Sequence, residues 1–210
     1  MIAGYVDAYG YHTFKTFLSF MSGNTTLAGY TIAHNHGAPA MLCLLAIVSF
    51  VIGTFTGTLL TYSGTHEARR LRFGAVAALL AVSMGLALLG WLGSAVRIAT
   101  LSVAMGMMNT ALSHVGAQSV SLTFVTGTLS RVGTHLALAI KRAPLQDAQG
   151  SWDTHGRRAF FLLGVWAGFL VGAMLGGAAT SRFGAWVLLL PLVILLALTL
   201  LDRTNADASA

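Results

Sequence analysis

Long apolar stretches separated by short polar ones run through most of the chain. Five segments contain no Asp, Glu, Lys or Arg, and they cover 16–66, 73–96, 98–130, 159–181 and 183–201. A helix that crosses a bilayer needs about 20 mainly apolar residues, which each of these segments approaches or exceeds. The pattern predicts a bundle of membrane-crossing helices, and it excludes a soluble enzyme, a disordered chain and a nucleic-acid-binding module.

The second half of the sequence repeats features of the first half in the same order. The tetrapeptide Arg-Phe-Gly-Ala occurs at 72–75 and again at 182–185. The other matched pairs are Phe20 with Phe124, Gly23 with Gly127 and Gly29 with Gly133 at an offset of 104, Gly4 with Gly106, Asp7 with Asn109 and His12 with His114 at 102, and Gly53 with Gly172 and Gly57 with Gly176 at 119. Four blocks in one order indicate an internal duplication, with repeats 1–95 and 96–210 in one integral membrane domain.

Each repeat is expected to contain one polar, glycine-bearing element and then two continuous, more apolar helices. The expected ranges are 1–34, 38–62 and 72–93 in the first repeat, and 97–140, 158–181 and 183–201 in the second, before a short polar tail. The first element is not one smooth helix, because its apolar stretch ends near His12 or His114 and a second helix starts at Ser22 or Thr126. We interpret it as a broken or re-entrant helix with one net crossing, capped at its second start by Ser22 or Thr126.

Charge is scarce and is concentrated in two loops. The chain has 12 Lys or Arg and 6 Asp or Glu, and basic residues gather in the expected loops 63–72 and 141–158. Lys and Arg favour the cytoplasmic side of a membrane, so we place both loops and both termini there. The basic loop follows the second element in one repeat and the first element in the other. The sequence therefore predicts an all-α polytopic membrane protein with about six net crossings, arranged as a 3+3 inverted-topology repeat. If each broken element crossed twice, one basic loop would face outside, which the charge rule disfavours.

The starts of the second helices form the predicted binding site. In inverted repeats with discontinuous helices, half-helix N-termini point into a cavity near the membrane midplane. Their N–H groups favour an anion or another polar acceptor. The alternative is that the hydroxyls only cap their own helices and the glycines only allow close packing. The predicted solute-binding residues at these starts are Ser22, Gly23, Asn24, Thr25, Thr126, Gly127 and Thr128.

Two ionisable residues inside apolar segments belong to the same predicted site. Asp7 lies in the apolar first part of the expected element 1–34, and Arg131 lies well inside the expected element 97–140. A charge at membrane depth is costly and suggests a function. With Asp7 and Arg131, we count Asn109, the counterpart of Asp7, among the predicted solute-binding residues. We hypothesise that Asp7 lines the central cavity and either pairs with Arg131 or takes up a coupling proton. The alternative is that Asp7 only accepts structural hydrogen bonds.

Other chemistry is weakly indicated. His12 and its counterpart His114 could relay protons, although a hydrogen-bonded structural histidine is the simpler interpretation. We predict no cofactor and no metal site, because the single cysteine, Cys43, lies in an apolar run and no ligand-spaced set of histidines is visible. Without a nucleophile–base set or a pair of carboxylates, an intramembrane enzyme is not expected.

One helix carries glycines at every fourth position: Gly164, Gly168, Gly172 and Gly176. Small residues at this spacing let helix backbones approach closely in lipid. Packing within the bundle is the main expectation for this ladder. The same kind of face could also support a homo-oligomer.

The segments 3–8 (Ala-Gly-Tyr-Val-Asp-Ala) and 20–25 (Phe-Met-Ser-Gly-Asn-Thr) resemble the YoaK-like family of bacterial membrane proteins, as does 124–129 in the second repeat. The resemblance covers nearly the whole chain and implies a multi-pass inner-membrane protein, often labelled a transporter, without a known substrate. Similar members carry an apolar stretch before the first motif. Because eight residues of the second repeat, 98–105, precede Gly106 while three precede Gly4, we expect the chain to start about ten residues late.

These observations favour a transporter or facilitator of a small polar solute, which binds between the repeats in a lipid bilayer. The helix N-termini and Arg131 favour an anionic or strongly polar solute. A channel would share every feature and lack only alternating access. A non-transporting scaffold or assembly partner would need Asp7 and the Ser/Thr motifs for structure alone. No nucleic-acid partner is expected, since the positive charge is explained by membrane orientation.

Overall fold

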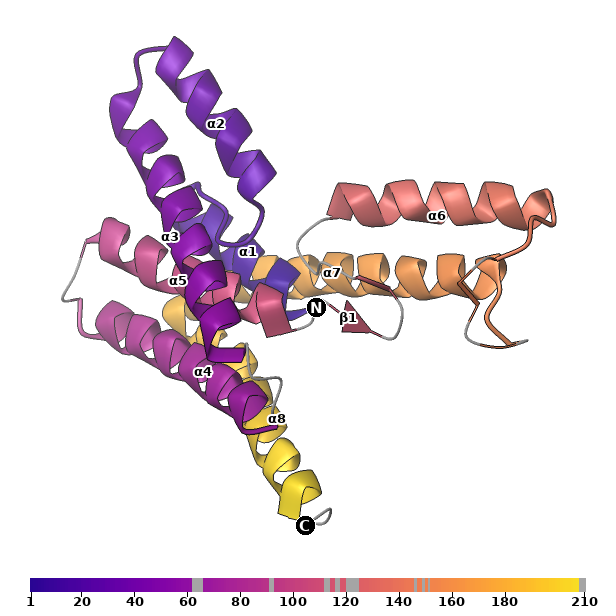
Figure 1. Ribbon diagram of the computed structural model, residues 1–210. Coiled ribbons are helices and arrows are strands. Elements are labelled where there is room, and N and C mark those ends of the chain that lie inside the picture. Colours follow the sequence, from indigo (N-terminus) through magenta and orange to yellow (C-terminus); the bar gives the residue numbers. More distant parts are fainter. Residues whose placement is uncertain are drawn as a thin grey trace.

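Helices make up most of the described residues in the computed structural model (Figure 1), which describes every residue except 62–65, 91–92, 112–113, 116–117, 120–124, 146, 149, 151 and 208–210. The helices are α1 (Ile2–Phe14), α2 (Met21–Ala33), α3 (Gly37–Thr61), α4 (His66–Leu88), α5 (Ser94–Ala111), α6 (Val125–Ile140), α7 (His155–Phe183), the 3-10 helix η1 (Gly184–Leu188) and α8 (Leu189–Asp207). Strands β1 (His114–Val115) and β2 (Gln118–Ser119) form a small antiparallel pair. Apart from this pair, the predicted all-α class is confirmed for the described residues.

Both predicted breaks are confirmed. In the first half, α1 ends at Phe14, and Lys15 takes a left-handed φ of 56° while its N–H donates to the carbonyl oxygen of Tyr11. The linker 15–20 then leads into α2. In the second half, α5 ends at Ala111 and α6 begins at Val125.

The predicted helix caps are wrong. Because α2 begins at Met21 and α6 at Val125, Ser22 and Thr126 lie inside the first turn instead of before it. Phe20 occupies the N-cap position of α2 and makes no side-chain cap hydrogen bond. Asp7 and Asn24, instead of a cap, hold the linker that leads into α2.

Two helix starts also differ from the expectation. α4 begins at His66 instead of near 72, and α5 begins at Ser94 instead of near 97, so Arg72 and Arg97 are helical. Arginine is a good helix former, and its long side chain can reach a polar partner from a helical position. The expected starts at 72 and 97 were therefore too late.

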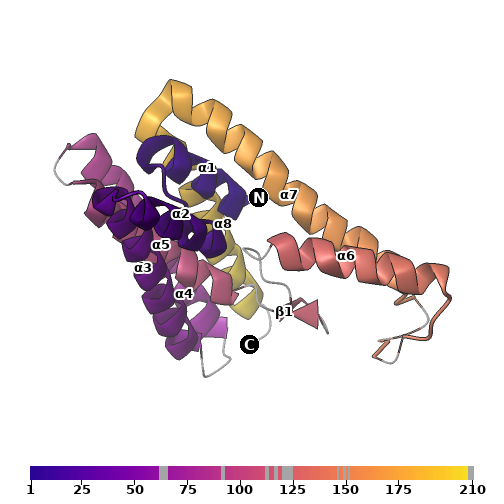
Figure 2. The same cartoon turned by 90° about the horizontal axis from the view of Figure 1, so that it is seen from above.

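The helices of the two halves exchange partners, as Figure 2 shows from above. α1 runs along α7, and α5 runs along α3. α2 folds back on α3 and α6 folds back on α7, which gives two helical hairpins that extend in different directions (Figure 1). α4 packs on both α5 and α8.

Equivalent glycines make the closest of these contacts. A Cβ on Gly4 of α1 would collide with the carbonyl oxygen of Phe169 on α7, and a Cβ on Gly106 of α5 would collide with that of Phe50 on α3. The two glycines are 102 apart and the two phenylalanines 119 apart, which are the offsets that relate these segments in the sequence. The same local packing therefore occurs twice.

The glycine ladder of α7 packs along part of its length. Gly172 and Gly176 meet the backbone of Met1 and Tyr5, whereas nothing would lie within 4 Å of a Cβ on Gly164. The packing interpretation is thus confirmed for the C-terminal part of the ladder.

Three stretches of the described helices are long and apolar enough to cross a membrane: Gly37–Leu60, Arg70–Leu88 and His155–Leu200. The last stretch contains α7, η1 and most of α8. A buried core of aliphatic, aromatic and methionine side chains joins α1, α4, α5 and α8. The predicted membrane character agrees with these lengths and compositions.

Candidate functional site

Asp7 holds the break of the first element. Its side chain lies on α1, is only 4% exposed, and points at the linker. One carboxylate oxygen accepts the backbone N–H groups of Leu18 and Ser19, both at 2.7 Å, and the other accepts the Ser19 hydroxyl at 2.6 Å. Three donors thus satisfy a buried carboxylate, which would be costly without them.

Asn24 holds the same linker from the other side. Its side-chain oxygen accepts the N–H of Phe17 at 2.9 Å, and its amide nitrogen donates to the carbonyl oxygen of Phe17 at 2.7 Å. Asn24 is fully buried in the first turn of α2. Asp7 and Asn24 together fix the path from α1 to α2, and therefore the direction in which α2 starts.

A cation lies at the end of α1. Arg97 of α5 donates to the hydroxyl of Tyr9, and its guanidinium group lies 4.9 Å from the centre of the Phe14 ring. Positive charge is favourable near a helix C-terminus, because the last carbonyl groups are unpaired there. The sequence had placed Arg97 in a loop, and neither of these contacts was predicted.

The second half keeps part of this arrangement. Thr128, the counterpart of Asn24, is also buried in the first turn of its helix, and Asn109, the counterpart of Asp7, is half-buried. Thr126 and Arg131 are exposed on α6. Residues 120–124 and the side chain of His114 lie outside the described part of the chain.

The N-terminal ends of α2 and α6 both face the middle of the molecule (Figure 1). Ser22 and Thr25 are exposed at the start of α2, and Gly23 and Gly127 are half-buried. The Thr25 hydroxyl donates to the carbonyl oxygen of Met21, in its own helix, at 2.9 Å. Helix starts carry N–H groups without intrahelical partners, so each of these ends can accept an anion or a polar group.

The hypothesised ion pair between Asp7 and Arg131 is wrong. Both oxygens of Asp7 are occupied by donors of the linker. The ion pairs of Arg158, with Asp147 and Asp153, do not involve Asp7. Asp7 is close to Ser19 because the chain reverses direction after α1, which the spacing of charged residues along the sequence does not show. His12, proposed as a proton relay with His114, is exposed on α1.

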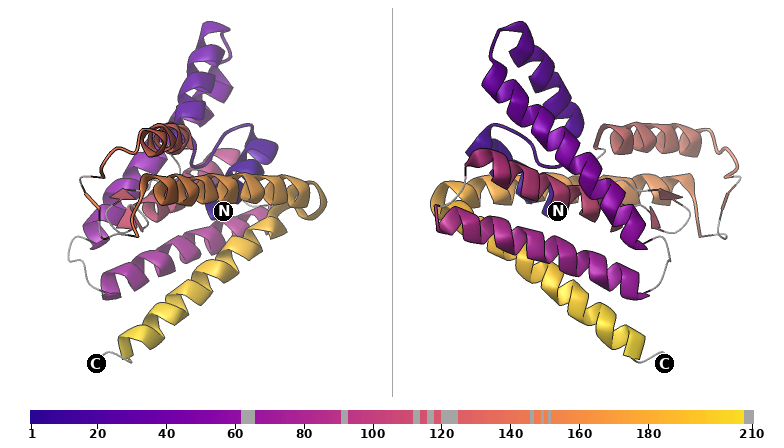
Figure 3. Two further views of the ribbon diagram at one scale, coloured as in Figure 1. Left: turned by 90° about the vertical axis from the view of Figure 1, so that its right-hand side faces the viewer. Right: turned by 60° about the vertical axis from the view of Figure 1, so that its left-hand side comes forward.

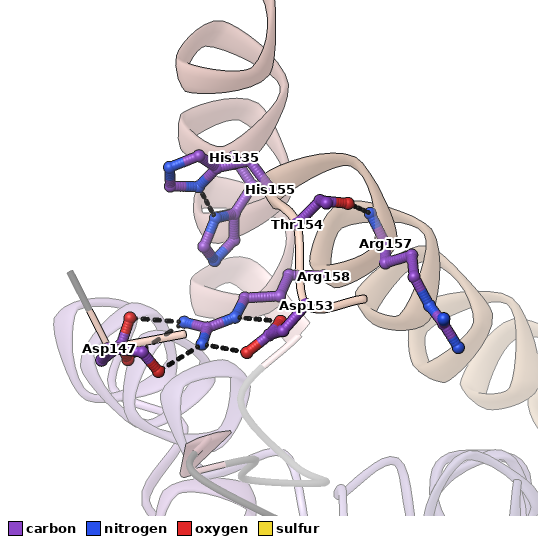
Figure 4. A network of polar contacts seen from close by, with 7 residues as sticks. All are labelled: His135, Asp147, Asp153, Thr154, His155, Arg157 and Arg158. Carbon is purple, nitrogen blue, oxygen red and sulfur yellow. Dashed lines mark hydrogen bonds and ion pairs between the residues drawn. The ribbon is translucent and has the colours of Figure 1, made fainter. Parts of the chain in front are cut away.

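A second polar network closes the α6–α7 hairpin (Figure 4). Arg158, near the start of α7, donates to both carboxylate oxygens of Asp147 at 2.9 and 3.0 Å and to both of Asp153 at 2.9 and 2.6 Å. Hydrogen bonding to Arg158 lowers the pKa of the Asp147 carboxyl from its ordinary value. The Nδ1 atoms of His135 and His155 lie 2.9 Å apart, so one ring donates and the other accepts.

This second network was missed in the sequence, where 141–158 was interpreted only as a basic loop. The two aspartates in an otherwise basic segment were the available signal. They offset the positive charge beside the start of α7 and tie the connection between the two helices to Arg158. The network lies at the end of the hairpin where α6 connects to α7, away from the start of α6 (Figure 1).

Taken together, apolar helices, a broken first element in each half and buried polar anchors at a break define a multi-span helical membrane protein. The chain belongs to the family described as "Protein of unknown function (DUF1275)", which matches residues 1–201. It is similar to a UPF0700 transmembrane protein of Rhizobium meliloti (strain 1021), with 32% identity over 200 residues that cover 94% of this chain and 80% of the relative. No solved structure matches the chain. The resemblance to YoaK-like membrane proteins is thereby confirmed.

Proposed function

We propose that the protein is a transporter or facilitator of a small polar anion, which binds between the starts of α2 and α6. The observation that carries this proposal is the convergence of these two helix starts on the middle of the molecule, each directly after a break. In the first half, Asp7 and Asn24 hold the break rigidly. A break leaves backbone N–H and C=O groups without helical partners, which is energetically costly in a membrane. Such a break is useful where a ligand binds to these backbone groups.

The architecture that we propose is a 3+3 inverted-topology repeat with about six crossings. It is supported by the exchange of partners, in which α1 packs on α7 and α5 packs on α3, with equivalent glycines at both contacts. Basic residues at the start of α4 and in 141–158 support a cytoplasmic position for both connections and for both termini, in the inner membrane. Inverted repeats of this kind alternate access around a site at their interface.

An anionic solute fits the charges near this site. The ends of α2 and α6 contribute the positive ends of two helix dipoles, and Arg131 adds a cation on the second turn of α6. The nearby carboxylate, Asp7, is turned toward the linker and accepts three hydrogen bonds there. The local field therefore favours negative charge.

Uptake into proteoliposomes tests the proposal. Purified protein would be reconstituted and offered radiolabelled small anions, such as phosphate, sulfate and short carboxylates, beside neutral and cationic solutes. We expect saturable uptake of an anion that is reduced at least tenfold by Thr126→Val or by Arg131→Gln. Thr134→Val is the control and should leave uptake unchanged, because it removes an exposed hydroxyl about two turns after Thr126 on α6. Counterflow would identify a carrier, and uptake without counterflow a channel.

A scaffold is the competing function. The observation in its favour is that Asp7 and Asn24 make their hydrogen bonds within their own element, which a purely structural role also requires. If no solute of any charge entered the vesicles while the protein remained folded, transport would be excluded and the scaffold supported.

A further inference from the structure

Two histidines join α6 to α7 near the connection between these helices. In Figure 3, α6 lies beside the first part of α7. Thr128 and Val132 are buried on α6, and His135 lies one turn farther along the same face, since residues three and four apart are neighbours on a helix. His155 is the first residue of α7, and its Nδ1 atom lies 2.9 Å from that of His135 (Figure 4). The pair is therefore part of the contact that holds the hairpin together.

The surroundings of His155 decide which ring donates. His155 is only 8% exposed, and its Nε2 atom has no hydrogen-bond partner among the described residues. A hydrogen on Nε2 would be a buried donor without an acceptor, which is costly. The hydrogen of neutral His155 is therefore on Nδ1, from which it is donated to Nδ1 of His135. His135, which is half-buried, then carries its own hydrogen on Nε2.

Uptake of a proton disturbs this arrangement. The two nitrogens without hydrogen are Nδ1 of His135, which accepts the bond, and Nε2 of His155, which is buried. A hydrogen on the first would place two N–H groups opposite each other, and a hydrogen on the second would create a buried donor without an acceptor. A single proton therefore weakens the link between α6 and α7.

The charged groups around the pair do not compensate an added proton. Arg131 of α6 and Arg158 of α7 face His135, as does Asp147 of the connection. Asp147 and Asp153 are both bound to Arg158, so their negative charge is largely balanced. A positive imidazole would thus be repelled by two arginines.

The equivalent hairpin of the first half cannot form the same pair. At the offsets of 104 and 119, the counterparts of His135 and His155 are Thr31 and His36. The Thr31 hydroxyl donates to the carbonyl oxygen of Leu27, in its own helix, at 2.7 Å. The α2–α3 hairpin therefore provides an internal comparison for the α6–α7 hairpin.

We propose that the His135–His155 pair is a pH-sensitive clasp, which holds α6 on α7 while both rings are neutral and releases it when the pair takes up a proton. Histidine is the side chain whose ordinary titration falls between pH 5 and pH 8, so the clasp responds to changes that a cell can produce. The basic segment 141–158, which joins the two helices, supports a cytoplasmic position for the clasp. This proposal does not depend on transport, because it concerns the position of α6 on α7.

Distances between spin labels give the first test. In a Cys43→Ala background, labels at Leu136→Cys on α6 and Phe160→Cys on α7 report on the hairpin, and both sites are exposed. We expect a short distance to dominate at pH 8 and a longer one to dominate at pH 5. The matched control is Ile32→Cys with Met41→Cys, the exposed counterparts of these sites in the α2–α3 hairpin, whose distance should not change. An unchanged distance in the α6–α7 hairpin, or an equal change in both hairpins, would overturn the proposal.

Two histidine variants separate the pair from other effects of acid. His135→Thr copies the residue of the first half, and His155→Phe keeps an aromatic ring without its nitrogens, so neither hairpin distance should depend on pH. Asp147 still carries its charge at pH 5, because hydrogen bonding to Arg158 holds the pKa of its carboxyl below 3.8. A pH response of the hairpin distance that persists in either folded variant would overturn the proposal.

A metal ion is the competing occupant, since two histidine nitrogens can also bind one zinc ion. Among the described residues, no group of three His, Cys, Asp or Glu side chains could complete such a site. We therefore expect equal melting temperatures at pH 8 with Zn²⁺ and with a chelator. Stabilisation by Zn²⁺ that is lost in His135→Thr would identify a metal site and would overturn the proposal.

Discussion

The carboxylate of Asp7 accepts both the backbone N–H of Ser19, at 2.7 Å, and its side-chain hydroxyl, at 2.6 Å. One residue of the linker is thus bound twice by a residue on the preceding helix. These two hydrogen bonds hold the break in one conformation, because they satisfy the carboxylate and two polar groups of the linker at once.

Replacing Asp7 by alanine should destabilise the protein strongly. The N–H groups of Leu18 and Ser19 and the Ser19 hydroxyl would lose their acceptor in a buried position, at a cost of about 3 kcal/mol or more. Ser19→Ala removes only the hydroxyl and should cost about 1–2 kcal/mol. The free energy of unfolding, measured by titration with a denaturing detergent and circular dichroism, checks the order of the two variants. A smaller effect of Asp7→Ala than of Ser19→Ala would contradict the assigned contacts.

That Asp7 takes up a coupling proton is a separate prediction, which does not follow from its hydrogen bonds to the linker. Asp7→Asn keeps the shape of the side chain and removes the charge. If Asp7 carries a coupling proton, the pH dependence of anion uptake should disappear in this variant while some uptake remains. Unchanged pH dependence in a folded Asp7→Asn protein would leave Asp7 with the structural role alone.

Replacing Asn24 by a residue that lacks either its hydrogen-bond acceptor or its donor should destabilise the protein. Its side chain accepts from and donates to the same residue, Phe17. Asn24→Asp keeps the acceptor but brings a second oxygen against the Phe17 carbonyl, so we expect a loss of about 1–3 kcal/mol, similar to that of Asn24→Ala. Thr25→Val is the control, because that exposed hydroxyl bonds only to its own helix, and it should change stability by less than about 0.5 kcal/mol. Wild-type stability of Asn24→Asp would show that the donor is not needed.

The sequence predicted the broken elements but not what holds them. Apolar periods, glycines and matched motifs locate the breaks to within a few residues, because a helix stops where its apolar pattern stops. The partners of Asp7 are 11 and 12 residues away, and those of Arg158 are five and 11 residues away. Side chains that touch on one helix are three or four residues apart, so pairing over these longer separations requires the three-dimensional path of the chain. For the same reason, charge alone suggested Arg131 as the partner of Asp7.

The internal duplication could be predicted from the sequence, but the contacts between the two halves could not. Matched glycines indicated close packing in both halves, but the sequence did not show that each half packs against the other. Gly4 contacts Phe169 and Gly106 contacts Phe50 because α1 packs on α7 of the other half and α5 packs on α3 of the other half.

Gly4→Ala and Gly106→Ala should destabilise the protein to a similar extent. In each variant the added methyl group would collide with a backbone carbonyl of the facing helix, and overpacking of this kind costs about 1–3 kcal/mol. Gly29→Ala is the matched control, since nothing lies within 4 Å of its Cβ position, and alanine there should stabilise α2 by up to about 1 kcal/mol. Melting temperatures in detergent check these expectations. A large effect of Gly106→Ala beside none for Gly4→Ala would show that the two contacts are not equivalent.

The network around Arg158 predicts a dependence of stability on acid pH. Hydrogen bonds from Arg158 hold the pKa of Asp147 below its ordinary value of 3.8. A carboxyl whose pKa is lowered by folding adds stability at pH values above 3.8, and this stability is lost as the pH falls through the lower, folded value. Asp147→Asn should therefore lower the melting temperature slightly at pH 7, and the difference from wild type should shrink as the pH falls below about 3.8 and vanish below the folded pKa. Because Asp147 is exposed, the effect should be small and reduced by salt. Arg157→Gln is the control, since Arg157 lies 5.2 Å from the centre of the Trp152 ring and its loss should not depend on pH in this range. An equal difference between wild type and Asp147→Asn at pH 3 and pH 7 would contradict the ion pair.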